Sequence, residues 1–285
     1  MAERTLIFPA EFDRGSNRWR LSYFNFTKYE NVRTDILTFV TFNTWFGNHY
    51  FDHRFRALMD ILKDTDADII GLQEMTHKSL KHLLKEEWVK KNYFISDLTG
   101  TTIYPYGVVL LSRIPVKFLV LHPLTGAMER QVLIAEFHIN GQKLLVGITH
   151  LESLRYSADI RSVQLDEIFT LLEYSDNSVL MGDFNFCSSW EENSNIDNRY
   201  SDIWKVLRAN EPGYTEDTEI NLMRQQMSRE EKQVRFDRII CRSSVPGWKP
   251  TKIHRLGMKP ISPEYPNIFP SDHFGLFGMF EWCSV

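Results

Sequence analysis

Cysteine is scarce in this chain of 285 residues, which has three cysteines and neither a CxxC pair nor an even framework. Disulfide-stabilised secreted domains and zinc ribbons depend on paired cysteines, so both classes are excluded. Cys187, Cys241 and Cys283 are therefore expected to be reduced thiols. Cys187 lies two residues after Asn185, but no histidine beside it in the sequence supports a nucleophilic role.

The chain also lacks a long apolar run and an excess of basic residues. No stretch of about 18 apolar residues occurs, and Met1–Asp13 lacks the regions of a signal peptide, so we expect an intracellular protein, nuclear or cytoplasmic, that neither spans a membrane nor is secreted. The formal net charge is −4, whereas proteins that coat duplex DNA are usually basic. Recognition of a nucleic-acid end or of a small phosphodiester needs less positive charge and remains open.

Several familiar motifs and linkers are missing. The chain has no Gly-rich phosphate loop of the Walker type, no Gly-x-Ser-x-Gly elbow and no HExxH motif, which disfavours an NTPase, a serine hydrolase and a zinc protease. No linker or internal repeat divides it. We therefore predict one domain over residues 1–285, in which residues 1–35, with Trp19, Tyr23 and Phe26, form an N-terminal extension or outer strand.

Apolar residues make up 43% of the chain, and their spacing alternates between strand and helix periodicity. This mixture of strands, hairpins and helices predicts an α/β sandwich, with two mixed β-sheets packed face to face and helices outside. The polar segments Glu191–Asn198 and Ala209–Lys232 are expected to be irregular. Strands are predicted over Ile36–Asn43, Asp68–Gln73, Tyr106–Leu111, Val116–Leu121, Val132–Ile139, Lys143–Thr149, Ser178–Met181, Gln233–Cys241 and Gly275–Phe280, and helices over Phe55–Lys63, Ser79–Val89 and Ala158–Glu173.

Four short polar islands lie far apart in the sequence, each beside an apolar, strand-like run. They are Thr41-Phe42-Asn43, Leu72-Gln73-Glu74, Gly182-Asp183-Phe184-Asn185 and Ser271-Asp272-His273. Together they carry three carboxylates, three amides and an imidazole. These groups can hold one Mg²⁺, bind a phosphate and activate a water, provided that the fold gathers them at one end of a sheet.

Glu74 and Asn43 follow two of these apolar runs. Glu74 is the best candidate for a metal ligand, because Mg²⁺ takes one or two carboxylates from a protein and fills its other positions with water or phosphate oxygens. Asn43 can contact the ion or steady a phosphate. Each also has a plainer interpretation, since Glu74 can cap a strand and Asn43 can satisfy loop backbone groups.

Asp183 and Asn185 are spaced i, i+2, so an extended segment places both side chains on one face. The acid can orient or deprotonate a water while the amide donates to a phosphoryl oxygen. A strand-end Asx turn is the alternative. His150 ends another apolar run and can donate to a phosphate oxygen, or it is simply a polar strand terminus.

His273 needs a fixed tautomer to bind a water or a phosphoryl group, and a carboxylate supplies this. Neighbouring side chains diverge, so Asp237 is a better candidate than Asp272 for orienting His273. Asp272 then faces the metal side. The alternative for His273 is a surface histidine near the C-terminus.

The islands TFN, LQE, THLES, GDFN, RFDRI and PSDH occur in an order that resembles the endonuclease/exonuclease/phosphatase superfamily, over about Ile36 to Trp282. The resemblance implies a four-layer α/β sandwich and Mg²⁺-dependent cleavage of phosphoesters, with Mn²⁺ as a possible substitute. His150-Leu151-Glu152-Ser153-Leu154-Arg155 with Arg161 and Gln164, together with the last two islands, is similar to the branch of 5′-tyrosyl-DNA phosphodiesterases.

That branch removes a tyrosine that a stalled topoisomerase II leaves on a DNA 5′ phosphate. The partner implied is a DNA 5′ end, single-stranded or frayed, carrying a tyrosyl adduct, and we expect a monomer. By the resemblance, Ser153 and Arg155 lie near the DNA end. Trp45 is a departure, because vertebrate members of the branch carry an acid two places after Asn43, and we expect Trp45 to shape the groove instead. The metal side is Glu74 and Asp272, and the hydrolytic residues are Asn43, His150, Asp183, Asn185, Asp237 and His273.

The chain departs from that branch at positions that concern DNA binding. Glu216 stands where an aromatic wall residue is expected, and Phe186-Cys187 follows Asn185 where a basic residue would suit DNA. Three alternatives therefore stay open: an abasic-site endonuclease, a lipid or inositol phosphodiesterase, and a non-catalytic binding domain of the same fold.

Overall fold

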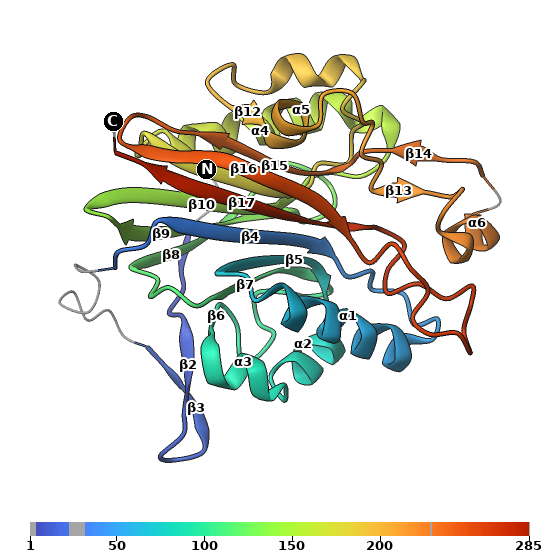
Figure 1. Ribbon diagram of the computed structural model, residues 1–285, viewed down its shortest axis with the longest axis horizontal. Coiled ribbons are helices and arrows are strands. Elements are labelled where there is room, and N and C mark those ends of the chain that lie inside the picture. Colours follow the sequence, from blue (N-terminus) through green and yellow to red (C-terminus); the bar gives the residue numbers. More distant parts are fainter. Residues whose placement is uncertain (1–3, 23–31, 229, 285) are drawn as a thin grey trace.

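The computed structural model describes residues 4–22, 32–228 and 230–284 of the chain (Figure 1). Two large mixed sheets pack face to face, and helices cover both outer faces. The predicted α/β sandwich is confirmed. None of the described helices is long and apolar enough to cross a membrane, and the three cysteines are free thiols.

The first sheet has the strand order β1-β8-β9-β10-β11-β15-β12. Its pairs are antiparallel except β10 with β11, which run parallel. Helix α4 covers its outer face (Figure 1), whereas α5 buries Ile203 and Trp204 in the core between the two sheets. Its strands span Thr5–Leu6 (β1), Phe118–Pro123 (β8), Gln131–Ile139 (β9), Gln142–His150 (β10), Asn177–Asp183 (β11), Asp237–Arg242 (β15) and Ser201–Asp202 (β12), and the helices span Ala158–Leu172 (α4) and Ile203–Leu207 (α5).

The second sheet has the order β16-β17-β4-β5-β7-β6-β2-β3, and β4 with β5 is its parallel pair. Helices α1, α2 and α3 cover its outer face (Figure 1). The strands span Gly247–Leu256 (β16), Gly275–Cys283 (β17), Ile36–Asn43 (β4), Ile69–Met75 (β5), Gly107–Ser112 (β7), Phe94–Ile95 (β6), Ala10–Asp13 (β2) and Arg18–Leu21 (β3), and the helices span Phe51–Thr65 (α1), His77–Leu83 (α2) and Glu87–Asn92 (α3).

The described part of the N-terminal extension contributes edge strands to both sheets. β1 pairs with β8 at one sheet edge, and β2 with β3 forms the edge hairpin of the other sheet. Trp19 lies in β3 and packs against the core beneath the helices. Tyr23 and Phe26 lie outside the described residues.

The segment Ala209–Lys232, predicted to be irregular, is partly ordered, so that prediction is wrong for its middle. It contains β13 (Glu216–Asp217) and α6 (Leu222–Ser228), and β13 pairs with β14 (Gln233–Val234) in a small separate sheet. These elements are short, and Met223 is the residue of α6 that is buried. A single buried apolar residue leaves no helical periodicity to detect. Two 3-10 turns, Arg155–Ser157 and Glu191–Asn195, complete the described elements.

Strand periodicity places the functional residues between the two sheets. In β4, Leu37 and Phe39 face the core between the sheets, so Asn43 ends the strand on that same face. The same count along β11, through Val179 and Met181, brings Asp183 to this face. His150 follows Ile148 of β10 in the same way. The polar residues therefore form the end of the inter-sheet core.

Gly71 in β5 sets how closely the two sheets approach just below these residues. A Cβ atom added at Gly71 would lie 3.0 Å from side-chain atoms of Ile148 and Met181 in the opposite sheet. A side chain at this position would require Ile148 and Met181 to move, whereas glycine permits the observed contact.

Candidate active site

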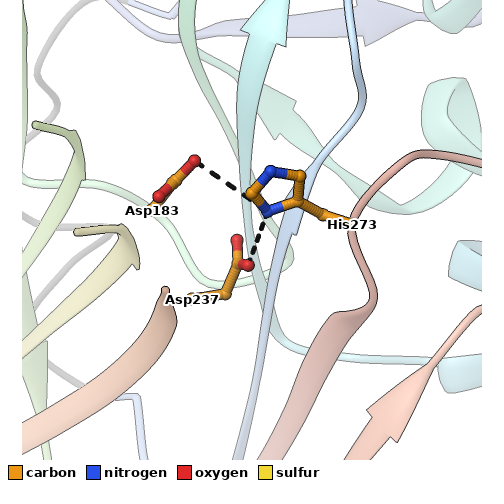
Figure 2. Close-up of side chains that lie close together, drawn as sticks. All are labelled: Asp183, Asp237 and His273. Carbon is orange, nitrogen blue, oxygen red and sulfur yellow. Dashed lines mark hydrogen bonds and ion pairs between the residues drawn. The ribbon is translucent and has the colours of Figure 1, made fainter. Parts of the chain in front are cut away.

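The register of the first sheet aligns three functional residues side by side. Asp183 is paired with His150 on the parallel strand β10 and with Asp237 on the antiparallel strand β15. Residues paired in register on one face have neighbouring side chains. Asp237 and His273 lie against Asp183, and ligand atoms of these three lie within 4.8 Å of one another (Figure 2).

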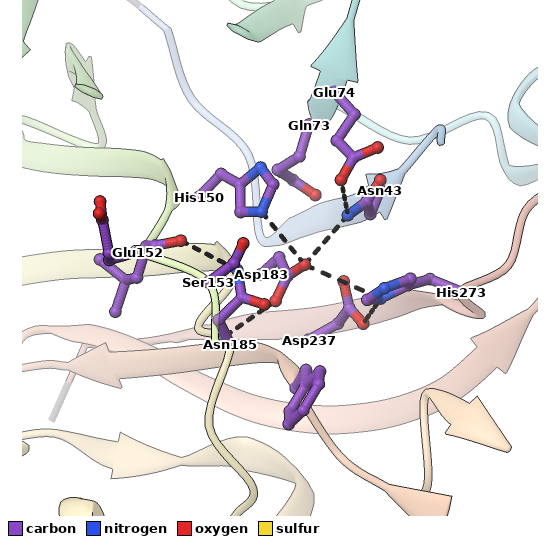
Figure 3. A network of polar contacts seen from close by, with 12 residues as sticks. Asn43, Gln73, Glu74, His150, Glu152, Ser153, Asp183, Asn185, Asp237 and His273 are labelled. Atoms are coloured by element: carbon purple, nitrogen blue, oxygen red, sulfur yellow. Dashed lines mark hydrogen bonds and ion pairs between the residues drawn. The ribbon is translucent and has the colours of Figure 1, made fainter. Parts of the chain in front are cut away.

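The second sheet brings Asn43 and Glu74 to the same place. Asn43 Nδ2 donates to Asp183 Oδ2 at 3.0 Å and to Glu74 Oε1 at 3.2 Å, so this amide joins the two sheets (Figure 3). Glu74 has a left-handed φ of 58°, and the register of β5 is irregular between Leu72 and Met75. This distortion lets Glu74 turn toward Asn43, although Leu72, two residues earlier, faces the helices.

Asp183 is a fixed carboxylate. It is 1% exposed, its Oδ1 accepts the backbone N–H of Asn185 at 2.8 Å, and its Oδ2 accepts from Asn43. Burial by itself would raise the pKa of Asp183, but the nearby His273 and His150 and these hydrogen bonds outweigh it, so the net pKa is lowered. Asp183 is therefore ionised and oriented.

Asp237 orients His273, as the sequence predicted. Oδ2 of Asp237 accepts a hydrogen bond from His273 Nδ1 at 2.8 Å (Figure 2). Burial raises the pKa of Asp237 to about 6. Burial lowers the pKa of His273, but the Asp237 and Asp183 carboxylates outweigh this and raise its pKa well above the usual value. His273 is thus an imidazolium at neutral pH, suited to donate to a phosphoryl oxygen.

His150 differs from His273 because its neighbour is a cation. Its Nδ1 lies 3.1 Å from Nη1 of Arg130. A guanidinium only donates hydrogen bonds, so Nδ1 accepts and the ring hydrogen is on Nε2, which faces Asp183 Oδ2 at 3.5 Å. Burial, followed by the charge of Arg130, lowers the pKa of His150 to about 3. His150 is therefore a neutral donor.

Glu74 and Asp272 fit a hard cation. Burial and then the Asp272 carboxylate raise the pKa of Glu74 to about 7, and burial also raises the pKa of Asp272. Acids that disfavour each other's ionised forms are a donor set whose repulsion a divalent cation relieves.

Asp183, Asp237 and His273 are also close enough to hold a metal. We assign these three to proton and phosphate chemistry, because Nδ1 of His273 is already bonded and an imidazolium repels a cation.

Three residues predicted to contact DNA lie around this centre. Ser153 accepts a hydrogen bond from Nη2 of Arg130 at 2.7 Å. Arg155 is exposed, and its guanidinium carbon lies 5.2 Å from the ring centroid of Trp190. Trp45, half-buried with a φ of 57°, lies under Arg54 at 4.1 Å. That these three side chains contact DNA stays a prediction.

Asn185, expected to bind phosphate, also has a structural bond. Its Nδ2 donates to the carbonyl of Leu151 at 2.9 Å, which fixes the segment that continues to Ser153. Its φ of 54° is left-handed, like that of Glu74. Backbone strain of this kind gathers at functional sites.

Sequence reasoning missed two arginines of the site. Arg130 is 5% exposed and bridges His150 and Ser153, and its Nε has no hydrogen-bond partner among the described residues. Arg54 is 1% exposed and donates to three backbone carbonyls, those of Gly47, His49 and Pro270. In the sequence, each is a charged residue beside an apolar run. The sequence gives no sign that an arginine is buried when its hydrogen-bond partners are distant in the chain or are backbone carbonyls.

A family model described as the endonuclease/exonuclease/phosphatase family matches residues 40–273. The chain therefore belongs to this family, as the motifs predicted. Tyrosyl-DNA phosphodiesterase 2 of Xenopus laevis is 29% identical over 241 residues, covering 80% of this chain and 62% of that protein. A 5′-tyrosyl-DNA phosphodiesterase of Caenorhabditis elegans is 26% identical over 236 residues with the same coverage. The chain thus spans about three fifths of the length of these relatives.

Solved structures of similar fold include D. rerio TDP2 complexed with a single-strand DNA product. Its TM-score is 0.76 at 24% identity, over 87% of this chain and 100% of that one. An endonuclease/exonuclease/phosphatase from Bacteroides vulgatus has a TM-score of 0.68 at 18% identity, also over 87% of this chain and 100% of the other. At such identities these structures show the fold.

Proposed function

We propose that this protein is a Mg²⁺-dependent phosphodiesterase that hydrolyses the 5′-phosphotyrosyl bond between DNA and a trapped topoisomerase II, leaving a 5′ phosphate. The observation that supports it most is the single network formed by Asn43, Glu74, Asp183, Asp237 and His273. The names of the relatives, tyrosyl-DNA phosphodiesterases, favour this substrate over others of the family. We place the protein inside the cell and expect it to act as a monomer.

In this mechanism Asp183 orients the attacking water and accepts its proton. Oδ1 of Asp183 is bonded to Asn185 and Oδ2 to Asn43, so the carboxylate holds one orientation. The imidazolium of His273 and the neutral Nε2–H of His150 donate to the phosphoryl oxygens, where negative charge builds in the transition state. Mg²⁺ held by Glu74 and Asp272, or Mn²⁺ in its place, would neutralise charge on the phosphate.

A phenolate leaving group suits this site. Phenol has a pKa of about 10, so phenolate departs more readily than a sugar alkoxide and needs no strong general acid. Asp183 is ionised, and in this mechanism the imidazolium of His273 and the Nε2–H of His150 donate to the phosphoryl oxygens, so no side chain is assigned to protonating a leaving group. An unassisted departure is therefore consistent with the charge states of the site.

The test compares four substrates with Mg²⁺ and with excess EDTA: a 5′-tyrosyl oligonucleotide, a 3′-tyrosyl oligonucleotide, an abasic duplex and sphingomyelin. We expect turnover of the first to exceed the others, to disappear with EDTA and to return with Mg²⁺ or Mn²⁺. A preference for the abasic duplex or for sphingomyelin would refute the proposed substrate. No metal-dependent turnover of any of the four would favour a binding domain of the same fold.

A further inference from the structure

Thr215, which none of the sequence motifs includes, joins the strand of Asp237 to the loop of His273. It precedes β13 and is 0% exposed. Its backbone carbonyl accepts the N–H of Phe274 at 2.7 Å, and its own N–H donates to the carbonyl of Val234 at 2.9 Å. The β13–β14 hairpin is thereby attached to the residue that follows His273.

The side chain of Thr215 binds the backbone at Asp237, the residue that is hydrogen-bonded to His273. Its Oγ1 accepts the backbone N–H of Phe236 at 3.1 Å and of Asp237 at 3.0 Å. A hydroxyl has two lone pairs and one hydrogen, so two accepted bonds leave it only the role of a donor. The described residues provide no hydrogen-bond partner for Oδ1 of Asp237, which is buried.

Within the described part of the chain, Asp237 thus has a buried acceptor without a partner, Oδ1. Thr215, which is bonded to the backbone of Asp237, has a hydroxyl hydrogen without an acceptor among the same residues. Burial raises the pKa of Asp237, and the side chains of His273 and, to a smaller extent, Thr215 act against that effect. A buried carboxylate oxygen costs free energy when left unpaired, which favours a hydrogen bond from the Thr215 hydroxyl to Oδ1.

We propose that Thr215 is a positioning residue that donates its hydroxyl hydrogen to Oδ1 of Asp237 and so fixes the Asp237–His273 pair. Oδ2 of Asp237 then remains directed at Nδ1 of His273, at 2.8 Å. The backbone of Thr215 holds the His273 loop at the same time. One buried residue therefore sets both sides of the pair. The kinetic part of the proposal rests on the phosphodiesterase activity proposed above.

The test uses Thr215→Val, which keeps the shape and removes the hydroxyl, and Thr215→Ser, which restores it. The readout independent of activity is the low-field proton NMR resonance of His273 Nδ1–H, assigned by its loss in His273→Asn. We expect Thr215→Val to shift or broaden this resonance and Thr215→Ser to restore it. On the 5′-tyrosyl oligonucleotide, Thr215→Val should lower kcat by about tenfold or more, with KM changed less than kcat.

Thr218 of the same hairpin is the matched control. It is equally buried, but its Oγ1 bonds to Lys232 rather than to the pair. Thr218→Val should leave both the resonance and kcat near the wild-type values. An unchanged resonance in Thr215→Val, or an equal shift in Thr218→Val, would overturn the proposal. If Thr215→Val does not fold, Thr215→Ala is read in the same way.

The NMR result also separates this proposal from the proposed function. A wild-type protein inactive on the 5′-tyrosyl oligonucleotide, with the resonance sensitive to Thr215→Val, would refute the substrate and support the role of Thr215. An active wild-type protein whose resonance does not respond to Thr215→Val would support the substrate and refute the role of Thr215.

Discussion

Asp183 is the residue at which the two sheets converge. It receives hydrogen bonds from Asn43 of the second sheet and from Asn185 of its own segment, and it lies 3.9 Å from Nδ1 of His273. Of the site's carboxylates, Asp183 has its pKa lowered, whereas those of Glu74, Asp237 and Asp272 are raised. Its charge is therefore the one that the fold itself stabilises.

Replacing Asp183 by Asn should remove the group that accepts the proton of water while leaving its hydrogen-bonded neighbours in place. We expect turnover of the 5′-tyrosyl oligonucleotide to fall by about a thousandfold or more, and a similar loss for His273→Ala. Steady-state kinetics measure this. The control Asp176→Asn removes an exposed carboxylate that pairs with Arg242 at the surface, and should leave the rate unchanged. Near-normal turnover by folded Asp183→Asn would refute the assigned role.

His150 should make the protein less stable in acid. Its folded-state pKa of about 3 lies below its usual value of 6.5, so the unfolded chain binds a proton that the folded one does not. The free energy of unfolding should therefore fall as pH decreases from about 6.5 toward 3, by at most about 1.4 kcal/mol per pH unit from this residue.

Urea unfolding at several pH values tests the contribution of His150. The His150→Gln variant should show a shallower dependence of the unfolding free energy on pH over this range than wild type. His49→Gln, at an exposed position, is the control and should keep the wild-type slope. Equal slopes for wild type and His150→Gln would contradict the assignment of His150 as a buried neutral donor.

At the residue scale, the positions of Asn43, His150 and Asp183 follow from the sequence because each ends a strand whose periodicity can be counted. Glu74 departs from that count because the end of β5 is irregular. The pairing of Asp237 with His273 was predicted from the divergence of neighbouring side chains, and it is confirmed. Arg130, 20 residues before His150 in the sequence, was not predicted. Its partner is a histidine rather than an acid, so no opposite charge in the sequence pointed to it.

At the scale of elements, Arg54 connects α1 to the two loops on the metal side. It donates to the carbonyls of Gly47 and His49 in the loop after β4, and of Pro270 in the loop before Asp272. Arg54→Ala would leave these carbonyls without the guanidinium, so we expect a loss of about 3 kcal/mol or more in the free energy of unfolding. Urea unfolding measures this.

A second readout separates loop positioning by Arg54 from general stability. The exposed Arg56 of the same helix is the control, and Arg56→Ala should change the unfolding free energy by less than about 0.5 kcal/mol. Because the loops carry Phe46, which donates to Glu74, and Asp272, Arg54→Ala should also require more Mg²⁺ for half-maximal activity. If a folded Arg54→Ala protein kept the wild-type dependence on Mg²⁺, the inference that these loops shape the metal site would be wrong.

Long elements were predicted well and short ones were not. The predicted helix Ala158–Glu173 corresponds to α4, and the strand Val132–Ile139 corresponds to β9, because each contains several turns or alternations of buried residues. Ser79–Val89, predicted as one helix, is two, α2 and α3, which are separated at Leu84–Glu86. Strand β16 was missed because its burial does not alternate cleanly and it contains Pro250 at a register shift.

For the whole molecule, the charge balance predicts how strongly the proposed binding of nucleic acid depends on salt. With a net charge of −4, binding should depend on a few local arginines rather than on a general positive field. The dissociation constant of Asp183→Asn for a 5′-tyrosyl single strand, measured over a range of salt, should give a log–log slope of association of roughly −2 or shallower.

Variants at two arginines locate that charge. Arg155→Ala should make the slope shallower by about 0.7, the contribution of one phosphate contact on a single strand. Arg18→Ala, on the edge strand β3, is the control and should not change the slope. A much steeper slope would mean that many phosphates are bound, and recognition of the end alone would be wrong.

Neither sheet holds a complete hydrolytic centre, since Asn43 and Glu74 come from one and His150, Asp183 and Asp237 from the other. Their alignment depends on the spacing that Gly71 permits against Ile148 and Met181. A methyl group added at Gly71 would press on these two side chains, which would have to shift by a few tenths of an ångström beside the centre. A position that performs no chemistry therefore helps to align the residues that do.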